Sequence, residues 1–478
     1  MYVDCGHPEY CTPECVHPFE MVQVLEYGNH ILSTMAKTGM VPKGGVILRN
    51  NYDPGSRQTW GCHESYNAKS NSDVRLYTKT MLIQMATRII YSGSGGLAPY
   101  GQFFISPRFS IKGDRFRWRE VYEDRLSYFD RSCTYKDGRG YSRDRRLHVY
   151  ASDTLCSHMS IYLRTGATAL ALLLAENDID PFDGCRMTPS LNCSDVNFNR
   201  DFHLKRTVAK SKTGKRLTMV GVQMHLLGAI EKHLKKSWMP GWAEEFLPIL
   251  SMVMQRLSKD APDSVATMLD WAIKLKMAER TLQKYPKRGD KQGKKAIAGL
   301  YQGKDPGSKD LYQLDFRYGQ LPDPSVFSEL DKAGVLEHRV PGYPEVKPDQ
   351  PISPKTARGK LRATTLKRAK RASLNETVRV GWDRMRCGNL QCYAKSPFAA
   401  KWIPTAASNT PEAKRRDAKI RKALGTLIGE PKAKPVKKKV TKKKATKKKA
   451  VKKKRTARPR QATIRARVVS EDVIDLSF

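Results

Sequence analysis

Two hydrophobic periods alternate along the chain, and together they predict an α+β protein. Apolar residues repeat with the 3.6-residue period of a helix over residues 17–37, 74–92, 216–236, 242–258 and 261–284. A further long helix follows Asp153 or Thr154, either of which can cap it, and a short helix lies near residues 325–336. Alternating or short apolar runs predict strands at 44–48, 59–66, 103–111 and 145–150. Because strands cluster early and helices late, we expect a mostly antiparallel sheet backed by helices.

The same pattern predicts three parts in the chain. Residues 1–340 carry the strands and most of the helices, and we expect them to form a catalytic domain. A proline-rich join at 341–354 opens a small C-terminal domain that extends to residue 402. From residue 403 to 478 lysine triplets separated by Ala, Thr or Val replace the apolar periodicity. Such a segment cannot bury enough apolar surface to fold, so it predicts a disordered basic tail.

The formal charge of +40 is not confined to that tail. Residues 431–460 hold 17 Lys or Arg and no acidic residue, and the last eighteen residues have a net charge of −1. This leaves +24 on residues 1–430, so the folded part is basic in its own right. A basic body attracts polyanions such as nucleotides, nucleic acids or acidic protein segments, and the tail is expected to contact nucleic acid weakly.

Cysteine usage and hydropathy bear on the compartment. The ten cysteines are scattered, the N-terminus lacks the basic and apolar regions of a signal peptide, and no apolar stretch approaches the ~18 residues of a membrane span. We therefore expect a cytoplasmic protein with reduced thiols and no membrane contact.

Candidate chemistry concentrates in the first seventy residues. Tyr2, Asp4, His7 and Glu9 lie in one short run, and a second polar cluster follows at 50–53 and 61–66. Carboxylates with small turn residues suit a magnesium–nucleotide site, because Mg²⁺ takes a few carboxylates and keeps water and phosphate as its other ligands.

Two plainer interpretations compete with this one. Acidic residues beside proline are often only turn formers or helix caps. Zinc ligation by Cys5, His7, Cys11, Cys15 and His17 is disfavoured, since only Cys11 and Cys15 have the spacing of a zinc knuckle.

Ordered motifs make the chain resemble the Pup ligase and depupylase family, whose catalytic domain is similar to that of glutamine synthetase. The blocks are YVDCGHPEY at 2–10, NNYD at 50–53, GCHESY at 61–66, SPR at 106–108, RRLHV at 145–149 and YLRTG at 162–166. Weaker matches follow at 269–271, 314–315, 361–362 and 396–398. The resemblance covers roughly residues 1–402 and excludes the tail.

The resemblance implies ATP and Mg²⁺ bound on a curved sheet. Family ligases phosphorylate the C-terminal glutamate of a small, acidic, disordered modifier, and a substrate lysine then displaces the phosphate to form an isopeptide bond. By position, Asp4 matches the catalytic aspartate, and Tyr2, Glu9 and Glu64 match metal-site residues. The remaining matches, His63, Arg146, His148, Arg358 and Arg362, are implied contacts of ATP or phosphate.

Three departures from the family pattern keep alternatives open. The opening strand of the family, which supplies another magnesium ligand, has no counterpart before Tyr2. The acidic, His-containing segment before the RRLHV block is replaced by RSCTYK at 131–136, and the tail is extra. We favour a ligase. The alternatives are a depupylase or deamidase acting on the same modifier, and an inactive scaffold that binds nucleic acid.

Overall fold

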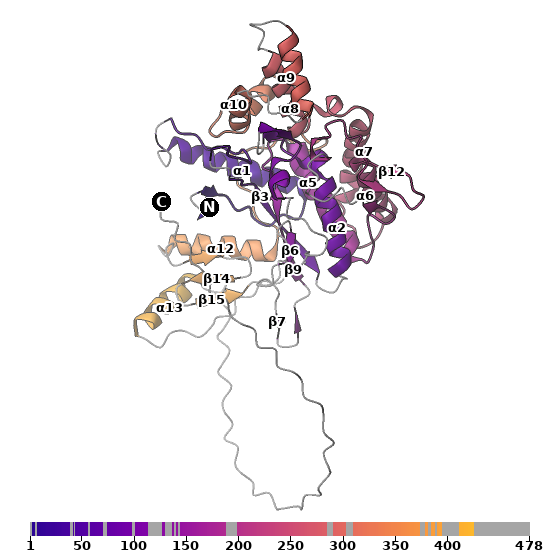
Figure 1. Cartoon of the computed structure of the whole chain (residues 1–478). Helices are drawn as coiled ribbons and strands as arrows, with labels where there is room; N and C mark the ends of the chain where they lie inside the picture. The colour runs from indigo at the N-terminus through magenta and orange to yellow at the C-terminus, as the bar shows by residue number, and fades with distance from the viewer. Residues whose placement is uncertain are drawn as a thin grey trace, which may run out of the picture. The chain divides into compact units, whose positions relative to one another are not determined.

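The computed structural model describes most of the first 424 residues, and every structural statement below concerns these (Figure 1). They are residues 2–4, 7–38, 42, 44–55, 58–69, 74–97, 101–112, 127–129, 136–137, 140–141, 144–187, 198–283, 290–302, 309–372, 378–380, 384–387, 390–393 and 411–424. Residues 1–430 form one compact unit, and the predicted tail after residue 430 lies outside the described residues, as does the segment 131–135.

The centre of this unit is helix α5 (His158–Glu176), which is buried along almost its whole length. It packs against α1 (Pro18–Lys37), α2 (Val74–Thr87), α3 (Ile89–Ser92) and α7 (Ala243–Asp260). Its N-cap is Ser157, whose hydroxyl accepts from the Ser160 amide at 3.2 Å. Neither of the two predicted caps, Asp153 and Thr154, is therefore the N-cap of this helix. The Asp153 carboxylate instead accepts from the Ser94 and Arg108 amides, both at 2.9 Å.

One face of α5 is covered by a three-stranded antiparallel sheet in the order β3-β9-β6. Its strands are β3 (Cys62–Lys69), β9 (Asp144–Ser152) and β6 (Ser127–Phe129). Leu147 and Val149 of β9 are fully buried, whereas His63, Ser65 and Asn67 of β3 are exposed. Because successive side chains of a strand point to opposite faces, this sheet has one core face and one open face.

The other described strands form small antiparallel sheets. They are β1 (Tyr2–Asp4) with β2 (His7–Glu9), β4 (Gly96–Leu97) with β5 (Phe103–Phe104), β7 (Lys136–Asp137) with β8 (Gly140–Tyr141), β10 (Arg186–Met187) with β11 (Ala209–Lys210) and β12 (Arg216–Leu217), and β13 (Val378–Val380) with β14 (Arg384–Cys387) and β15 (Leu390–Tyr393). The mixed α+β class is confirmed. A single curved sheet is not what the described residues show.

Two predicted strands differ from the observed elements. The run 103–111 holds the two-residue β5 and then helix α4 (Pro107–Lys112), because Pro107 suits a first helical turn and the Ser106 hydroxyl accepts from the Phe109 amide. The run 44–48 contributes only one bridge, between Ile47 and Leu321.

The later part of the unit is helical, and the 3.6-residue period predicts its helices in 216–236, 242–258 and 261–284 and the short one near 325–336. Its helices are α6 (Met219–His233), α7, α8 (Asp270–Gln283), α9 (Asp290–Gln302), α10 (Lys309–Tyr318), α11 (Val326–Lys332), α12 (Ala357–Arg371) and α13 (Pro411–Leu424). Residues 286–309, whose lysines and glycines predict a loop, instead contain helix α9. Among the described helices none combines the length and the apolarity that crossing a bilayer requires.

Helix α13 differs from the expectation that the chain is disordered from residue 403 onward. Ile420 and Leu424 are fully buried in a small apolar cluster with Ala369 of α12 and with Met385 and Cys387 of β14. Two apolar residues four positions apart lie on the same side of a helix, which is enough to dock an otherwise polar segment. The folded part therefore continues at least to Leu424.

A buried ion pair connects the sheet to the helices behind it. The Arg88 guanidinium, at the junction of α2 and α3, binds the Glu64 carboxylate of β3 through two nitrogens, at 2.5 and 3.0 Å. Arg88 also donates to Thr168 of α5 at 2.6 Å and to Ser152 of β9 at 2.7 Å. One cation therefore joins three elements.

Helix packing generates the first prediction. A Cβ added at Gly166 of α5 would lie 2.2 Å from a ring carbon of Phe246 in α7, whereas nothing lies within 4 Å of one added at Gly228 of α6. Gly166→Ala should lower the free energy of unfolding by about 1 kcal/mol or more, because the packed ring must move. Gly228→Ala should raise it by about 1 kcal/mol through helix propensity. Urea unfolding of both variants checks this, and a stabilising Gly166→Ala would contradict the packing.

The ion pair generates a second, pH-dependent prediction. Burial alone would raise the pKa of Glu64, but Arg88 and Arg164 outweigh it and lower the pKa to about 2 from an ordinary 4.5. This carboxylate therefore contributes stability that is complete above about pH 4.5 and is lost as the pH falls toward about 2.

At neutral pH, Glu64→Gln should cost about 3–5 kcal/mol of unfolding free energy, because Arg88 stays buried without a charged partner. The difference in unfolding free energy between this variant and the wild type should become smaller as the pH falls below about 4.5. The control is Glu337→Gln, which removes an exposed partner of Arg256 and should change stability by under about 1 kcal/mol. Denaturant titrations at several pH values measure the unfolding free energy of both variants. If the difference between Glu64→Gln and the wild type did not depend on pH, Glu64 would not be the buried, ionised carboxylate assigned here.

Candidate functional site

The N-terminal hairpin brings several sequence-predicted site residues to one place. Strand β1 pairs with β2 in antiparallel register, so that Tyr2 lies opposite Glu9 and Asp4 lies opposite His7. Directly opposed residues of an antiparallel pair share a face, and so do residues two apart on one strand. These four positions therefore belong to one face of the hairpin, although seven residues separate the first from the last.

An aromatic contact joins this hairpin to the second polar cluster. The His7 ring lies 5.1 Å from the Trp60 ring, measured between centroids. Trp60 is held in turn by the buried Asn51, whose side-chain amide donates to the Trp60 carbonyl at 3.0 Å. The two clusters that the sequence places about fifty residues apart are thus neighbours.

The chain between Trp60 and β3 passes very close to the end of β9. A Cβ at Gly61 would lie 2.3 Å from the Ser152 carbonyl oxygen, so only glycine fits there without a backbone shift. Just beyond it, the pairing of β3 with β9 changes register between Cys62 and Glu64. His63 lies at this irregularity, and such bulges re-aim the side chains beside them.

The open face of the sheet carries three further predicted residues. Ser65 pairs with His148, and Asn67 pairs with Arg146, so both β9 positions share the face of the exposed β3 residues. His63 is exposed on that same side of β3. The register thus groups the predicted phosphate contacts His63, Arg146 and His148.

Glu64 lies on the opposite, core-facing side of β3. Both of its carboxylate oxygens accept hydrogen bonds from the Arg88 guanidinium, and the Ser152 and Tyr66 hydroxyls donate to them as well. Arg164 lies 3.9 Å away, and its Nη2 contacts the Cys62 sulfur. In this structure the Glu64 carboxylate is therefore committed to a buried network.

Arg358 and Arg362 meet at a second acidic residue. Both guanidiniums bind Glu14, Arg362 at 3.1 Å, and the Thr356 hydroxyl donates to the other oxygen of that carboxylate at 2.6 Å. Arg358 is almost fully buried. The contact ties the start of α12 to the segment that follows the hairpin, and two guanidiniums against one carboxylate leave a local excess of positive charge.

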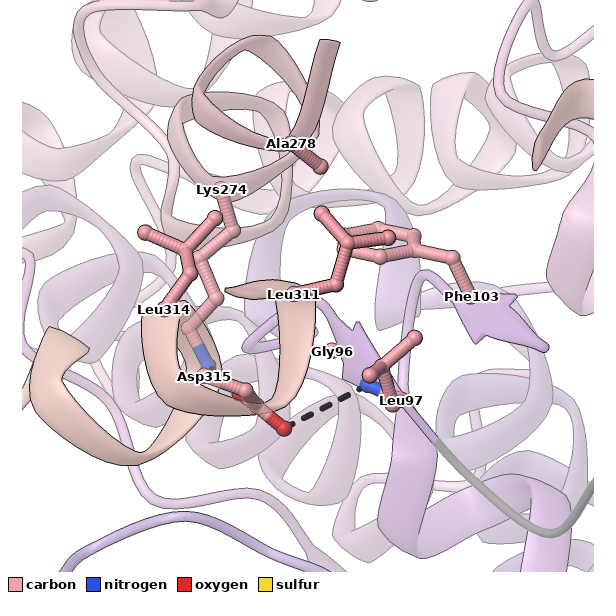
Figure 2. A pocket seen from close by; sticks show the side chains of 8 residues that line it. All are labelled: Gly96, Leu97, Phe103, Lys274, Ala278, Leu311, Leu314 and Asp315. Carbon is pink, nitrogen blue, oxygen red and sulfur yellow. Dashed lines mark hydrogen bonds and ion pairs between the residues drawn. The ribbon is translucent and has the colours of Figure 1, made fainter. Parts of the chain in front are cut away.

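A small pocket lies apart from these residues, between β4 and helices α8 and α10 (Figure 2). Figure 2 shows Lys274 and Asp315 at its wall, with Asp315 accepting from the Leu97 amide at 3.3 Å. Lys274 binds Asp315 at 2.7 Å and also donates to the Gly95 carbonyl. Its two charges satisfy each other and the other lining residues are mostly apolar, so this pocket is part of the core.

The donor set of the hairpin fits Mg²⁺. Glu9 and Tyr2 offer a carboxylate and a phenol as oxygen donors, and Mg²⁺ needs few protein oxygens when phosphate and water supply the rest. Among the residues that the structure describes, no group of three His, Cys, Asp or Glu side chains is arranged to bind a metal ion.

Several residues that make important structural contacts received no role in the sequence reasoning. Arg88 lies in an apolar helical run. A cation in such a run indicates a buried ion pair, because a charge in a core needs a partner of opposite charge. Arg164 lies within a quoted motif but received no role. Trp60 and Glu14 act through contacts distant in the chain, for which spacing carries no signal.

Comparisons with known proteins point to one family. Residues 1–386 match the family model described as Pup-ligase protein. A Pup–protein ligase of Actinosynnema mirum is 25% identical over 416 residues, covering 84% of this chain and 86% of its own. A Pup deamidase/depupylase of Mycolicibacterium smegmatis is 30% identical over 293 residues, covering 58% of this chain and 56% of its own.

Two solved structures have a similar fold. The Pup ligase PafA in complex with ADP aligns with a TM-score of 0.66 at 21% identity, over 88% of this chain and 87% of that one. The complex between Pup and its ligase PafA aligns with a TM-score of 0.67, over 88% and 82%. The chain belongs to the Pup-ligase family, a family of ATP-dependent carboxylate–amine ligases.

Proposed function

We propose that this chain uses ATP and Mg²⁺ to join the C-terminal glutamate of a Pup-like modifier to lysines of substrate proteins. The observation that carries the proposal is the register of the hairpin, which groups Tyr2, Asp4, His7 and Glu9. The His7–Trp60 contact places this group beside the cluster that leads into β3. The relative named as a ligase also aligns over more of both chains than the depupylase does.

The chemistry requires activation of an unreactive carboxylate. The γ-phosphoryl group of ATP passes to an oxygen of the modifier's terminal glutamate side chain, and ADP leaves. The substrate lysine nitrogen then attacks the acyl carbon, the carbon–oxygen bond to phosphate breaks, and phosphate leaves with the electron pair. The attacking ammonium must first lose a proton.

The residues divide this work by position. Asp4 accepts the lysine proton, and Tyr2 and Glu9 hold Mg²⁺, which supplies positive charge against the phosphates. His63, Arg146 and His148 on the open face contact the phosphates, where preorganised donors and cations stabilise the charge that develops during transfer. Arg358 and Arg362, set by Glu14, extend this positive field.

We assign Glu64 a positioning role instead of the metal contact implied by resemblance. Its hydrogen bonds to Arg88 hold β3 in register, and that register decides that His63 lies on the open face.

The partner fits the charge of the chain. The Pup of the solved complex binds its ligase, and we propose a Pup-like, acidic and disordered modifier for this chain. With +24 on residues 1–430, the folded part attracts such a modifier and raises its rate of encounter. Lysine-bearing proteins are the second substrate.

A depupylase or deamidase is the second candidate, and one observation favours it. The alignment with the M. smegmatis deamidase/depupylase has the higher identity, although it covers less of each chain. In that reaction the same hairpin residues would serve cleavage of the isopeptide or amide bond. The third candidate is an inactive scaffold that binds nucleic acid, and for such a protein we expect no turnover of ATP.

One assay separates the three functions. The full chain is incubated with MgATP, an acidic modifier ending in glutamate and a lysine-bearing protein, and ADP release and adducts are followed by mass spectrometry. A ligase yields ADP together with a modifier–lysine adduct. A depupylase instead cleaves a preformed conjugate, and a modifier ending in glutamine reveals a deamidase. If ADP, adduct and cleavage are all absent, the enzymatic proposal is wrong.

Replacing Asp4 tests the assigned base. Asp4→Asn should reduce turnover by about 100-fold or more, because an amide cannot accept the lysine proton. ATP binding and unfolding free energy should stay near those of the wild type. The matched control is Asp183→Asn on an exposed loop, which should leave turnover unchanged. Full activity in Asp4→Asn would refute the assignment.

A further inference from the structure

Tyr10 directly follows the hairpin and packs on helix α1. It is bonded to Glu9, which lies opposite Tyr2 in the hairpin. A Cβ added at Gly28 of α1 would lie 2.4 Å from Cδ1 and 2.9 Å from Cγ of the Tyr10 ring. The ring therefore occupies the space that any larger side chain at position 28 would fill. Tyr10 ends the YVDCGHPEY block, yet it has no part in the proposed chemistry.

The part of α1 beneath this ring is held in place on both sides of Gly28. The Glu26 carboxylate lies 3.5 Å from the His158 ring of α5, and Asn29 accepts from the Arg49 guanidinium at 2.7 Å. Gly28 itself is buried, and α1 packs against α5. Because these contacts hold α1 against the core, a ring packed on Gly28 has a fixed position relative to that core.

The contact between Tyr10 and Gly28 depends on shape and not on charge. Glycine is less favourable than alanine inside a helix, and Gly28 lies well away from both ends of α1. A glycine at such a position usually has a packing reason, which the ring supplies here. Burial raises the pKa of Tyr10 to about 12, so its phenol is uncharged at neutral pH.

The chain after Tyr10 is held at further points. The Glu14 carboxylate binds the Arg358 guanidinium, and the Val16 amide donates to Glu20 at 2.8 Å. These contacts fix the segment that leads into α1. Tyr10 is closer in the chain to the hairpin than any of these residues, so its ring controls where the open end of the hairpin lies.

We propose that Tyr10 is a positioning residue, whose ring on Gly28 fixes the hairpin and with it Asp4. The inference rests on the proposed ligation and adds a residue that acts through the hairpin. The His7–Trp60 contact holds the hairpin beside its turn, and Tyr10 holds its open end. A displacement of about 1 Å at the reacting groups can lower a rate by about 100-fold.

A single methyl group tests this arrangement in the full chain. Gly28→Ala places a carbon where the ring lies, and the ring must move because Cγ, the atom that joins it to the backbone side, is itself too close. For ligation, kcat should fall about 10- to 100-fold, while KM for the lysine-bearing protein should change less than about 3-fold. The control is Gly228→Ala, a helical glycine with nothing within 4 Å of an added Cβ, which should keep both constants near those of the wild type.

A double-mutant cycle identifies the ring as the cause. Tyr10→Ala removes the ring and should lower kcat by a similar factor, whereas Tyr10→Phe keeps the ring and should retain kcat within about 3-fold. Adding Gly28→Ala to Tyr10→Ala should cause no further loss, because the methyl group then has no ring to displace.

Hydrogen–deuterium exchange follows the hairpin independently of catalysis. Peptides that cover residues 2–9 should exchange faster in Gly28→Ala and Tyr10→Ala than in the wild type and Tyr10→Phe, because a hairpin without its anchor opens more often. Circular dichroism checks that each variant is folded.

Three results would overturn the proposal. Wild-type kcat and exchange in Gly28→Ala would mean that the place of the ring does not matter. Losses that add in the double variant would mean that the methyl group acts through another contact. Equal exchange in all variants would mean that Tyr10 does not hold the hairpin. Absence of turnover in the wild type would instead refute the proposed ligation, and the exchange comparison would then decide whether the anchor exists.

Discussion

The buried pairing of Glu64 with Arg88 is the constraint on which the rest of the site depends. It links β3 to the junction of α2 and α3, and through Thr168 and Ser152 to α5 and β9. Because side chains alternate along a strand, a slip of one residue would move Glu64 to solvent and His63 into the core. A charge that must stay paired away from water makes that slip costly. The ion pair therefore determines which residues of β3 lie on the open face of the sheet.

The side chains assigned to the proposed chemistry are held in place by two separate sets of contacts. The hairpin register collects the candidate carboxylates, and the His7–Trp60 contact sets it beside the start of β3. Glu14 holds Arg358 and Arg362 near the same N-terminal segment, although about 340 residues separate them in the chain. The proposal needs long-range contacts of this kind, because the residues that it assigns to one site are scattered over residues 2–362.

Much of the fold follows from local pattern. The helical period located α1, α2, α5, α6, α7, α8 and α11, and alternation located β3 and β9, because burial of one face leaves a direct signature. Short elements were harder to predict from the sequence. Pro107 turned a predicted strand into a helix, and α13 was missed because only Ile420 and Leu424 carry its packing against a basic background. At the candidate site, the register puts Asp4 and Glu9 on one face of the hairpin, and their roles stay predictions. The network around Glu64 could not be anticipated, since its partners come from four elements.

The separation of core face and open face has an evolutionary consequence. Leu147, Val149 and Glu64 hold the sheet in place, whereas His63, Ser65 and Asn67 contribute little to that packing. Selection for folding and selection for chemistry thus act on different positions of the same strand. Descendants of such a gene can change reaction, or abandon it, one exposed residue at a time without passing through an unfolded intermediate. A family that both attaches and removes one modifier is an expected product of that freedom.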